Sequence, residues 1–414
     1  MLVIHISTPP TTTTALYIYI FSSKAYLRNS PNLMVKGKYR REENKRMNFS
    51  VQRLPLLDAL QKVQTVVEKK NTIQILGNIL CHVKGQELSL YATDLEVGIK
   101  ITLSVESTTE GKFTLSAKHF LDIVKELPEK PLHIRKKDNS WIEIICEKSK
   151  FSIVSLPAEQ YPVLPSFEDK QYFEARSDAL INMMDRTHFA ASTDSTRYHI
   201  NGVYFESLEN SLMRMIATDG HRLSFVDQEV FLKSPELKRG IIIPKKGLLE
   251  FRKLLDPSEE ILGLCFERGF LFAQFKDCYL FVRLIDGDYP DYRPVIPKSM
   301  NRLVKIERQK FNSALKRVSL LSNEKSRGIK LCLESGTLVI LSSNSEMGEA
   351  REEIEVKYQG DSMEIGFNSK YLLENLSVMK SDQIEFHLKD PLSPGIIREV
   401  DLSNHTYVIM PMKI

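Results

Sequence analysis

Alternating apolar and polar residues predict short β-strands along most of the chain after residue 47. The clearest runs end at turn-forming residues such as Gly, Asn, Asp and Pro. They cover residues 87–93, 113–117, 141–147, 150–156, 240–244, 271–275, 279–285, 328–334, 337–343, 363–367, 383–388 and 406–412. Because strands this short are joined by tight turns, we expect antiparallel hairpins.

Apolar residues at helical spacing occur in two kinds of segment. The first kind follows a short extended stretch, in FSVQRLPLLDALQKV, FEARSDALINMMDRT and VKIERQKFNSALKRV, which span residues 49–63, 173–187 and 304–318. The second kind opens at Lys118, Lys246 and Lys370. Many strands with few helices predict an α+β fold class.

The same order of elements recurs three times along the chain. Asp94 in YATDLE, Asp219 in IATDGHR and Asn344 in LSSNSE are separated by 125 and 125 residues. This spacing exceeds the roughly 20 to 50 residues of a solenoid repeat. It predicts a domain of about eight strands and two helices, written three times. Pro-rich linkers after Tyr161 and Tyr289 place the domains at residues 47–170, 171–297 and 298–414.

The first 46 residues differ from the rest in composition and charge. They hold eight basic and two acidic residues, a net charge of +6, which leaves −2 of the total +4 for the remaining chain. We expect residues 1–46 to be a disordered extension, or a misassigned start upstream of Met47. A basic nucleic-acid-binding arm is the alternative. A mildly acidic body excludes a protein that coats nucleic acid by bulk charge.

Five widely spaced cysteines predict buried, reduced thiols in a cytoplasmic protein, and no metal site, because no Cys-x-x-Cys pair is present. No apolar run approaches the roughly 18 residues of a membrane span, so no membrane association is expected. The phosphate-binding glycine loops and the nucleophile elbow are also missing from the sequence.

The most enzyme-like string is Thr218-Asp219-Gly220-His221, in which the aspartate could orient the imidazole for acid–base chemistry. The equivalent strings around Asp94 and Asn344 lack the histidine. A turn, formed by the Asp or Asn side chain on its own backbone, explains all three copies and is the favoured interpretation. The terminal Met410-Pro411-Met412 is unusually apolar and suggests a surface that accepts several partners.

Eight strings, in order, resemble the bacterial DNA polymerase III β sliding clamp family: ILGNIL, ATDLE, RYHINGVYFE, ATDGHRL, DGDYPDYRPVIP, LLSNEKSRGIKL, MEIGFNSKYLLENL and YVIMPMKI. The resemblance covers residues 47–414. It implies three repeated clamp domains per chain and a head-to-tail homodimer, a six-domain ring around duplex DNA that makes no sequence-specific contact. It also implies a non-catalytic protein without cofactors, which tethers the α subunit of DNA polymerase III, is opened by a clamp loader, and binds other polymerases and repair proteins.

The resemblance further implies a groove for partner peptides, in which apolar side chains bury the peptide's Leu and Phe. The residues of this sequence that match the family's groove motifs, and that the resemblance implies line the groove, are Arg197, Ile200, Thr218, Gly220, His221, Arg222, Leu223, Pro290, Val295, Asn368, Tyr371, Met410, Pro411 and Met412. Two positions depart from the family's common pattern. His199 stands where Tyr is common, and Pro294 where Arg is common, which puts the chemistry of the rim in doubt.

The family's dimer seam, carried over by motif, places Phe151 and Ile153 of one subunit against Leu320 and Leu321 of the other. DNA-facing positions are Lys70, Lys118, Arg317 and Lys325. Two other functions stay open from the residues alone. One is an enzyme that uses Asp219 and His221, and the other is a monomer that binds DNA through residues 1–46.

Overall fold

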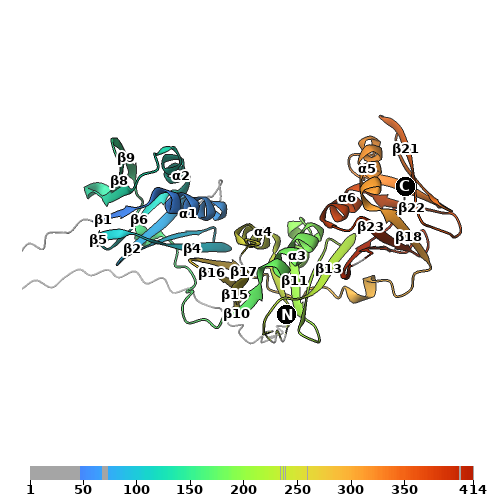
Figure 1. Ribbon diagram of the computed structural model, residues 1–414, viewed down its shortest axis with the longest axis horizontal. Helices are drawn as coiled ribbons and strands as arrows, with labels where there is room; N and C mark the ends of the chain where they lie inside the picture. The colour runs from blue at the N-terminus through green and yellow to red at the C-terminus, as the bar shows by residue number, and fades with distance from the viewer. Residues whose placement is uncertain are drawn as a thin grey trace, which may run out of the picture. The chain divides into compact units, whose positions relative to one another are not determined.

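The computed structural model describes residues 47–67, 73–233, 235, 237, 239–258, 260–400 and 402–413. Within these ranges the same succession of strands and two longer helices occurs three times (Figure 1). The first repeat contains β1 Asn48–Val51, α1 Arg53–Val66, β2 Asn78–Lys84, β3 Glu87–Thr93, β4 Val97–Ser104, β5 Glu106–Thr109, β6 Gly111–Ser116, α2 Ala117–Glu126, β7 Leu132–Lys136, β8 Trp141–Cys146 and β9 Ser149–Val154.

The second and third repeats follow the same plan, except that single β-bridges, Ala175 with Phe231 and Lys305 with Lys357, stand where the first repeat has β5. The second contains β10 Phe173–Arg176, α3 Ser177–Thr187, β11 Gly202–Ser207, β12 Leu212–Thr218, β13 Arg222–Glu229, β14 Ile241–Pro244, α4 Lys245–Leu254, β15 Ile261–Glu267, β16 Phe270–Phe275 and β17 Cys278–Arg283. The third contains β18 Arg302–Glu307, α5 Arg308–Val318, β19 Gly328–Glu334, β20 Thr337–Asn344, β21 Gly348–Glu355, β22 Met363–Asn368, α6 Ser369–Val378, β23 Gln383–Leu388, β24 Gly395–Glu399 and β25 Leu402–Ile409.

Each helix has one apolar face and begins where the sequence predicts. Lys118, Lys246 and Lys370 are each the second residue of their helix, so the predicted starts of α2, α4 and α6 are confirmed. The side chain of Ser116 caps α2, and that of Asn368 caps α6, each accepting a hydrogen bond from a backbone N–H of the first turn. Apolar spacing therefore explains all three helices, and a side-chain cap adds to it in α2 and α6.

The strands form four sheets, and two of them cross from one repeat to the next. β4 pairs antiparallel with β17, with Val97 opposite Val282. β13 pairs antiparallel with β25, with Arg222 opposite Ile409. The resulting eight-stranded sheets run β10-β15-β16-β17-β4-β3-β2-β6 and β14-β11-β12-β13-β25-β24-β23-β18. The predicted α+β class with antiparallel sheets is therefore confirmed, but the sheets do not stay within single repeats.

Two smaller sheets remain, and each belongs to one repeat. The first runs β5-β1-β7-β8-β9 and the other β21-β20-β19-β22. Both β9 and β21 are therefore edge strands among the strands that the structure describes.

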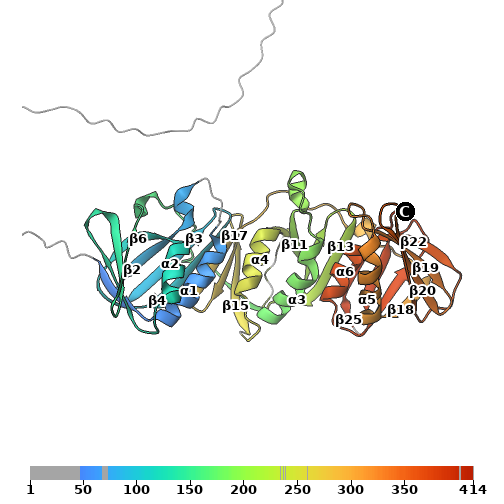
Figure 2. The same cartoon turned by 90° about the horizontal axis from the view of Figure 1, so that it is seen from above.

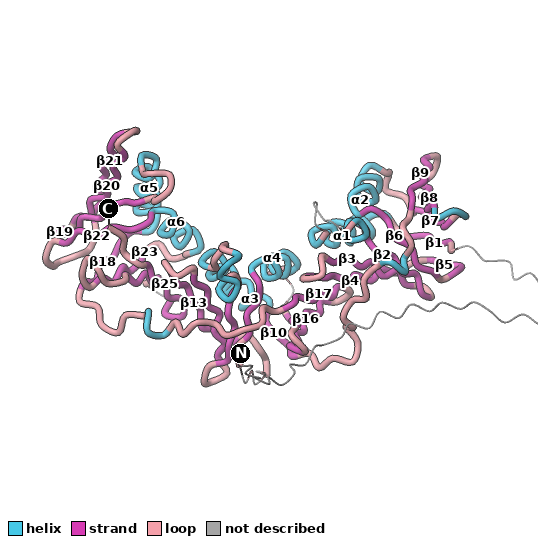
Figure 3. The backbone as a smooth tube through the Cα atoms, turned by 180° about the vertical axis from the view of Figure 1, so that it is seen from behind, coloured by secondary structure: helices cyan, strands magenta, loops and turns pink. Residues whose placement is uncertain are grey.

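The helices pack over one face of the sheets and bury the apolar positions of each repeat. In Figures 2 and 3 the pairs α1 with α2, α3 with α4 and α5 with α6 follow one another along the same side. The buried face of α1 consists of Leu56, Ala59, Leu60, Val63 and Val66. None of the helices in the described ranges is long and apolar enough to cross a membrane.

The cysteine prediction is only partly correct. Cys81, Cys146 and Cys265 are buried, whereas Cys278 and Cys332 are half-buried. Burial raises the pKa of the Cys81 thiol, which keeps it protonated and unreactive.

Candidate functional site

The turn predicted at the three repeat landmarks is present in every copy. Asp94 Oδ1 accepts hydrogen bonds from the backbone N–H groups of Glu96 (2.9 Å) and Val97 (2.6 Å). In the second repeat Asp219 Oδ1 accepts from His221 (2.9 Å) and Arg222 (3.1 Å). Asn344 accepts from the backbone of Glu346 at 2.9 Å.

Asp219 therefore orders a loop and does not orient an imidazole. It accepts a hydrogen bond from the backbone N–H of His221. The His221 ring instead lies nearly parallel to the Tyr371 ring, with centroids 6.5 Å apart. This geometry removes the basis for an acid–base pair, and it places His221 beside the first turn of α6.

The C-terminal segment joins this loop to the third repeat. The N–H of Met410 donates to the carbonyl of His221 at 2.9 Å, and the N–H of Met412 donates to the carbonyl of Gly366 at 2.9 Å. Met410, Pro411 and Met412 are all half-buried. The apolar end of the chain is thus held between β13 and β22 and presents part of each methionine to solvent.

Arg222 connects the two sides of this site. Its side chain is only 6% exposed, and its Nε donates to Asp219 Oδ2 at 3.0 Å. It also forms an ion pair with Glu374 of α6, donates to the carbonyl of Phe189 at 2.7 Å, and lies 4.3 Å from the centroid of the Tyr371 ring. Burial acts against the charged form, but Tyr407, Glu374 and Asp219 raise the pKa of Arg222, so the guanidinium stays charged.

An apolar cluster forms the floor next to these groups. Leu223 is 2% exposed and packs with Ile216, Phe225, Tyr292, Ile396 and Val408, against which Val295 and Tyr289 also lie. The Pro-rich linker is fixed there, because the Tyr289 ring stacks on Tyr204 with centroids 4.9 Å apart. Pro290, next in the chain, remains exposed.

Arg197, Gly220 and Asn368, three further predicted positions, are fixed by backbone geometry and hydrogen bonds. Arg197 donates to the carbonyl of Asp219 at 2.7 Å. Gly220 has φ of +89°, and a Cβ atom there would lie 2.7 Å from the Arg197 guanidinium, so only glycine fits this turn without displacement. Asn368 caps α6 and donates to the carbonyl of Ser326 at 3.1 Å.

The remaining predicted positions lie around these elements. Ile200 is buried and Thr218 is half-buried; the Thr218 hydroxyl donates to the carbonyl of Arg222 at 2.6 Å. His199 packs edge-on against Tyr198, with centroids 5.6 Å apart. Pro294 lies exposed in the short helix η6, Arg293–Val295. The structure thus brings together segments that lie far apart in the sequence.

The predicted seam residues lie on two different edge regions of the chain. Phe151 and Ile153 belong to β9, and Phe151 is 36% exposed. Leu320 and Leu321 belong to the short helix η7, Ser319–Leu321, which follows α5 beside β21, and Leu320 is 73% exposed.

The predicted DNA-facing residues differ in how free their charges are. Lys70 lies outside the described residues. Arg317 is paired with both carboxylate oxygens of Glu352, which neutralises much of its charge. Lys118 and Lys325 are exposed, and among the described residues neither forms an ion pair. Lys316 on α5, which the sequence did not single out, is exposed and equally unpaired within the described ranges.

Three comparisons with known proteins agree with this architecture. Family profiles described as the N-terminal, central and C-terminal domains of the DNA polymerase III beta subunit match residues 47–165, 174–291 and 293–413. The beta sliding clamp of Pseudomonas aeruginosa is 36% identical over 369 residues, 89% of this chain and 100% of that protein. That of Haemophilus influenzae is 34% identical over 378 residues, 89% of this chain and 100% of that protein.

Solved structures give the same result. The crystal structure of the DNA polymerase III subunit beta from Pseudomonas aeruginosa matches with a TM-score of 0.84 at 35% identity, over 89% of this chain and 100% of that chain. The beta sliding clamp from C. crescentus matches with a TM-score of 0.85 at 34% identity, over 89% of this chain and 99% of that chain.

The repeated domains and the sheets that they share therefore define a clamp-type protein. The chain belongs to the DNA polymerase III beta subunit family, and its role is that of a sliding clamp, a processivity factor in DNA replication.

Proposed function

We propose that two copies of this chain close head to tail into a ring around duplex DNA and carry partner proteins on the groove described above. Each chain contributes three domains, residues 47–170, 171–297 and 298–414. The observation that supports closure is the way the repeats already join within one chain. In both internal junctions, the strand after the Asp turn pairs with the last strand of the next repeat.

The third such junction is incomplete within one chain. The strand after the Asn344 turn is β21, and the last strand of the first repeat is β9. Both are edge strands among the described residues. An unpaired strand edge is a template for pairing with another chain. If β9 of a second copy pairs with β21 of the first, the third junction becomes equivalent to the other two. A head-to-tail contact of this kind can close a ring.

The repeat also predicts the register of that pairing. The internal pairs are Val97 with Val282 and Arg222 with Ile409. One step of 125 residues carries Val97 to Arg222, and a second step carries Arg222 to Met347. Tyr161 and Tyr289, which mark the two linkers, are 128 residues apart, and the same step carries Val282 back to Val154. Met347 and Val154 are 53% and 52% exposed. We therefore place Met347 opposite Val154 of the second copy.

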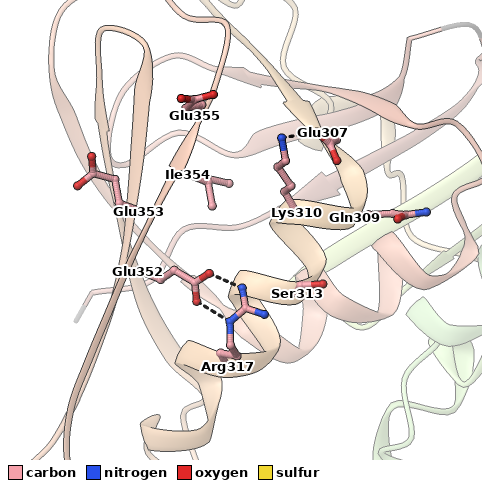
Figure 4. A pocket seen from close by; sticks show the side chains of 9 residues that line it. All are labelled: Glu307, Gln309, Lys310, Ser313, Arg317, Glu352, Glu353, Ile354 and Glu355. Carbon is pink, nitrogen blue, oxygen red and sulfur yellow. Dashed lines mark hydrogen bonds and ion pairs between the residues drawn. The ribbon is translucent and has the colours of Figure 1, made fainter.

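A cleft beside β21 supports the same arrangement (Figure 4). Its volume is about 490 Å³, and it lies between α5, with Ser313 and Arg317, and β21, with Glu352, Glu353 and Glu355. Asp58, Lys62, Thr102 and Leu103 occupy the equivalent positions in the first repeat. There they line one side of a cleft whose other side is the α4 end and the β16–β17 turn of the second repeat.

In the proposed seam, the β8–β9 turn of the second copy takes that place. This turn carries Lys148, and Lys150 follows on β9. Glu352 and Glu353 are already paired with Arg317 and Arg351, and Lys150 with Glu143. Lys148 facing Glu355 therefore supplies the charge complementarity that favours this pairing over others. Phe151 and Leu320 supply the apolar part of the seam.

The ring makes the polymerase processive because it encircles the DNA and does not need to bind it tightly. Because a closed ring cannot dissociate from circular DNA sideways, it holds the polymerase at high effective concentration without tight DNA binding. Lys118, Lys316 and Lys325 are the exposed, unpaired cations proposed to face the phosphates. The function needs no catalytic chemistry and no cofactor from this chain.

The groove is proposed to bind short peptides from DNA polymerase III, from the clamp loader and from other polymerases and repair proteins. Its supporting feature is an apolar floor at Leu223 and Val295, flanked by polar groups at Arg197 and His221 and by the flexible thioethers of Met410 and Met412. Such a site suits several partners that share Leu and Phe anchors.

A disulfide trap tests the ring. In a chain with Val154→Cys and Met347→Cys, oxidation should give a covalent dimer, since directly opposite residues on antiparallel strands have Cα atoms about 4.5–5.5 Å apart. Each single variant is the matched control for the natural cysteines. After loading onto nicked circular DNA, the cross-linked dimer should stay bound, and linearising the DNA should release it. Failure to cross-link in a dimeric protein would contradict the register.

A further inference from the structure

Beneath the groove, a buried polar cluster joins the second repeat to the third. It consists of Arg186 at the end of α3, Ser224 on β13, Glu399 at the end of β24 and His405 on β25. Arg186 is 3% exposed, Glu399 is 2% exposed, and Ser224 and His405 are fully buried. Burying charged and polar groups is costly unless they are fully paired, so the contacts of each atom decide what the cluster does.

Every member of this cluster finds a partner. Arg186 forms an ion pair with Glu399, and its Nη1 donates to His405 Nδ1 at 3.1 Å. Glu399 Oε1 accepts from the backbone N–H groups of Lys380 and Ser381 at 2.6 and 2.8 Å. Although burial favours the protonated acid, the Arg186 guanidinium and these backbone hydrogen bonds hold the pKa of Glu399 far below its usual range.

The hydrogen-bond geometry fixes the state of the histidine. A guanidinium has only donors, so His405 Nδ1 must accept and cannot carry a proton. The Ser224 hydroxyl donates to the carbonyl of Arg186 at 2.6 Å, so its oxygen is available to accept from His405 Nε2–H at 3.1 Å. Burial lowers the pKa of His405, which agrees with a neutral ring.

The position of this cluster can be compared among the three repeats. Arg186 corresponds in sequence to Lys62 on α1 and Arg317 on α5. The Lys62 side chain is 47% exposed and pairs with Asp58 of its own helix, and that of Arg317 is 61% exposed and pairs with Glu352 of its own repeat. Among these three cations, Arg186 alone is buried and bonded to the next repeat. At this position of the helix, the junction that carries the groove therefore has a buried ion pair, whereas the first internal junction has an exposed lysine paired within its own helix.

The buried polar cluster contacts both elements that form the third-repeat side of the groove. Glu399 holds the backbone just after α6, whose first turn carries Tyr371 and whose N-terminus is capped by Asn368. His405 lies on β25, which leads directly to Met410. The Tyr407 hydroxyl, between them in sequence, donates to the carbonyl of Tyr371 at 3.0 Å. A change at Glu399 is thus transmitted to the helix and to the strand together.

We propose that Arg186, Glu399 and His405 are positioning residues for the peptide groove: they set the separation between the Asp219 loop and the side formed by Tyr371 and Met410. This inference rests on the proposed peptide-binding function of the groove. None of the three needs to touch the peptide. Residues that share one hydrogen-bond network are strongly coupled, so loss of one partner changes the geometry of the rest.

The test uses the full chain and a fluorescent peptide that carries Leu and Phe anchors. Arg186→Met should weaken peptide binding about tenfold and shift the ¹³C-methyl NMR signals of Met410 and Met412. Lys62→Met, at the equivalent position of the other internal junction, should change neither. If Arg186→Met folds poorly, Glu399→Gln, which keeps the side-chain shape, should still shift both methyl signals and weaken binding.

A double variant separates positioning from stability. Arg186→Met with Glu399→Met removes the unpaired buried charge and should recover most of the thermal stability, while the peptide affinity stays weak. Recovery of full affinity together with stability would overturn the proposal, as would unchanged affinity in the folded single variants. Deletion of residues 410–414 is the reference: if it leaves peptide affinity unchanged, the groove assignment itself fails.

Discussion

The backbone N–H of Met410 donates to the carbonyl of His221 at 2.9 Å, which ties the end of the chain to a loop of the preceding repeat. The two residues are 189 positions apart in the sequence. Met410 directly follows β25 and His221 directly precedes β13, and these two strands pair with each other. This contact makes the C-terminal segment a structural part of the proposed peptide groove. It also explains why an apolar chain end is ordered there.

Deletion of residues 410–414 should therefore abolish peptide binding. The deletion removes the thioethers of Met410 and Met412 and the backbone contacts to His221 and Gly366. It leaves β25 and the β13–β25 pairing intact, so the dimer should persist. Fluorescence anisotropy with a labelled peptide and analytical ultracentrifugation measure the two effects. A deletion variant that binds peptide as the parent does would show that the peptide site lies elsewhere.

Asp219→Ala should weaken the groove without weakening the seam. The substitution removes two backbone hydrogen bonds and the contact with Arg222, at a cost of about 1–3 kcal/mol for the buried groups left unpaired. Asp94→Ala removes the equivalent turn in the first repeat and is the matched control. Peptide titration should show a loss for Asp219→Ala only. Equal losses would mean that the turns act through global stability.

Lys118→Ala combined with Lys316→Ala should reduce the salt dependence of DNA retention. Each lysine that neutralises a phosphate contributes about one unit to the slope of log affinity against log salt concentration. The control is Lys62→Ala, because Lys62 is already paired with Asp58 at 2.8 Å. The retention of loaded clamp on circular DNA is measured across salt concentrations. An unchanged slope in the double variant would remove these two residues from the DNA-facing surface.

The stability of the junction between the second and third repeats should fall on acidification. A histidine with a lowered pKa stabilises the folded chain while neutral, and this contribution is lost as the pH falls below about 6.5, the usual pKa of histidine. The loss for Glu399 starts lower, below about 4.3, because its folded pKa is also lowered.

Thermal unfolding from pH 7.5 to pH 5 tests this prediction. His405→Gln should show a smaller fall in Tm than the parent, although its Tm at pH 7.5 is lower. A parallel fall in both proteins would assign the acid sensitivity to other groups, among them His82 and His387, whose pKa values are also lowered by burial.

Local features of this fold could be predicted from the sequence because their causes are local. The turns at Asp94 and Asp219 use each residue's own neighbours in the chain. The helix starts at Lys118 and Lys246 follow from apolar spacing and adjacent strands. The triplication itself was visible as a period, and the family resemblance brought the groove residues together.

The pairing between repeats could not be predicted from local patterns. Nothing in the sequence near Val97 specifies Val282 as its partner, because strand pairing over this separation depends on the packing of whole domains. The burial of Arg186 could not be predicted for the same reason. In the sequence Arg186 resembles Lys62 and Arg317, but of these three side chains only Arg186 is buried against Glu399. Arg317 was predicted to face DNA, yet its charge is engaged by Glu352.

Closure of a two-chain ring through β9 and β21 is the central claim, and sedimentation of the full chain tests it most directly. At micromolar concentration the parent should sediment as a dimer, and Phe151→Ala with Leu321→Ala should sediment as a folded monomer. A parent chain that stays monomeric at that concentration, or a double variant that stays fully dimeric, would contradict the proposed seam.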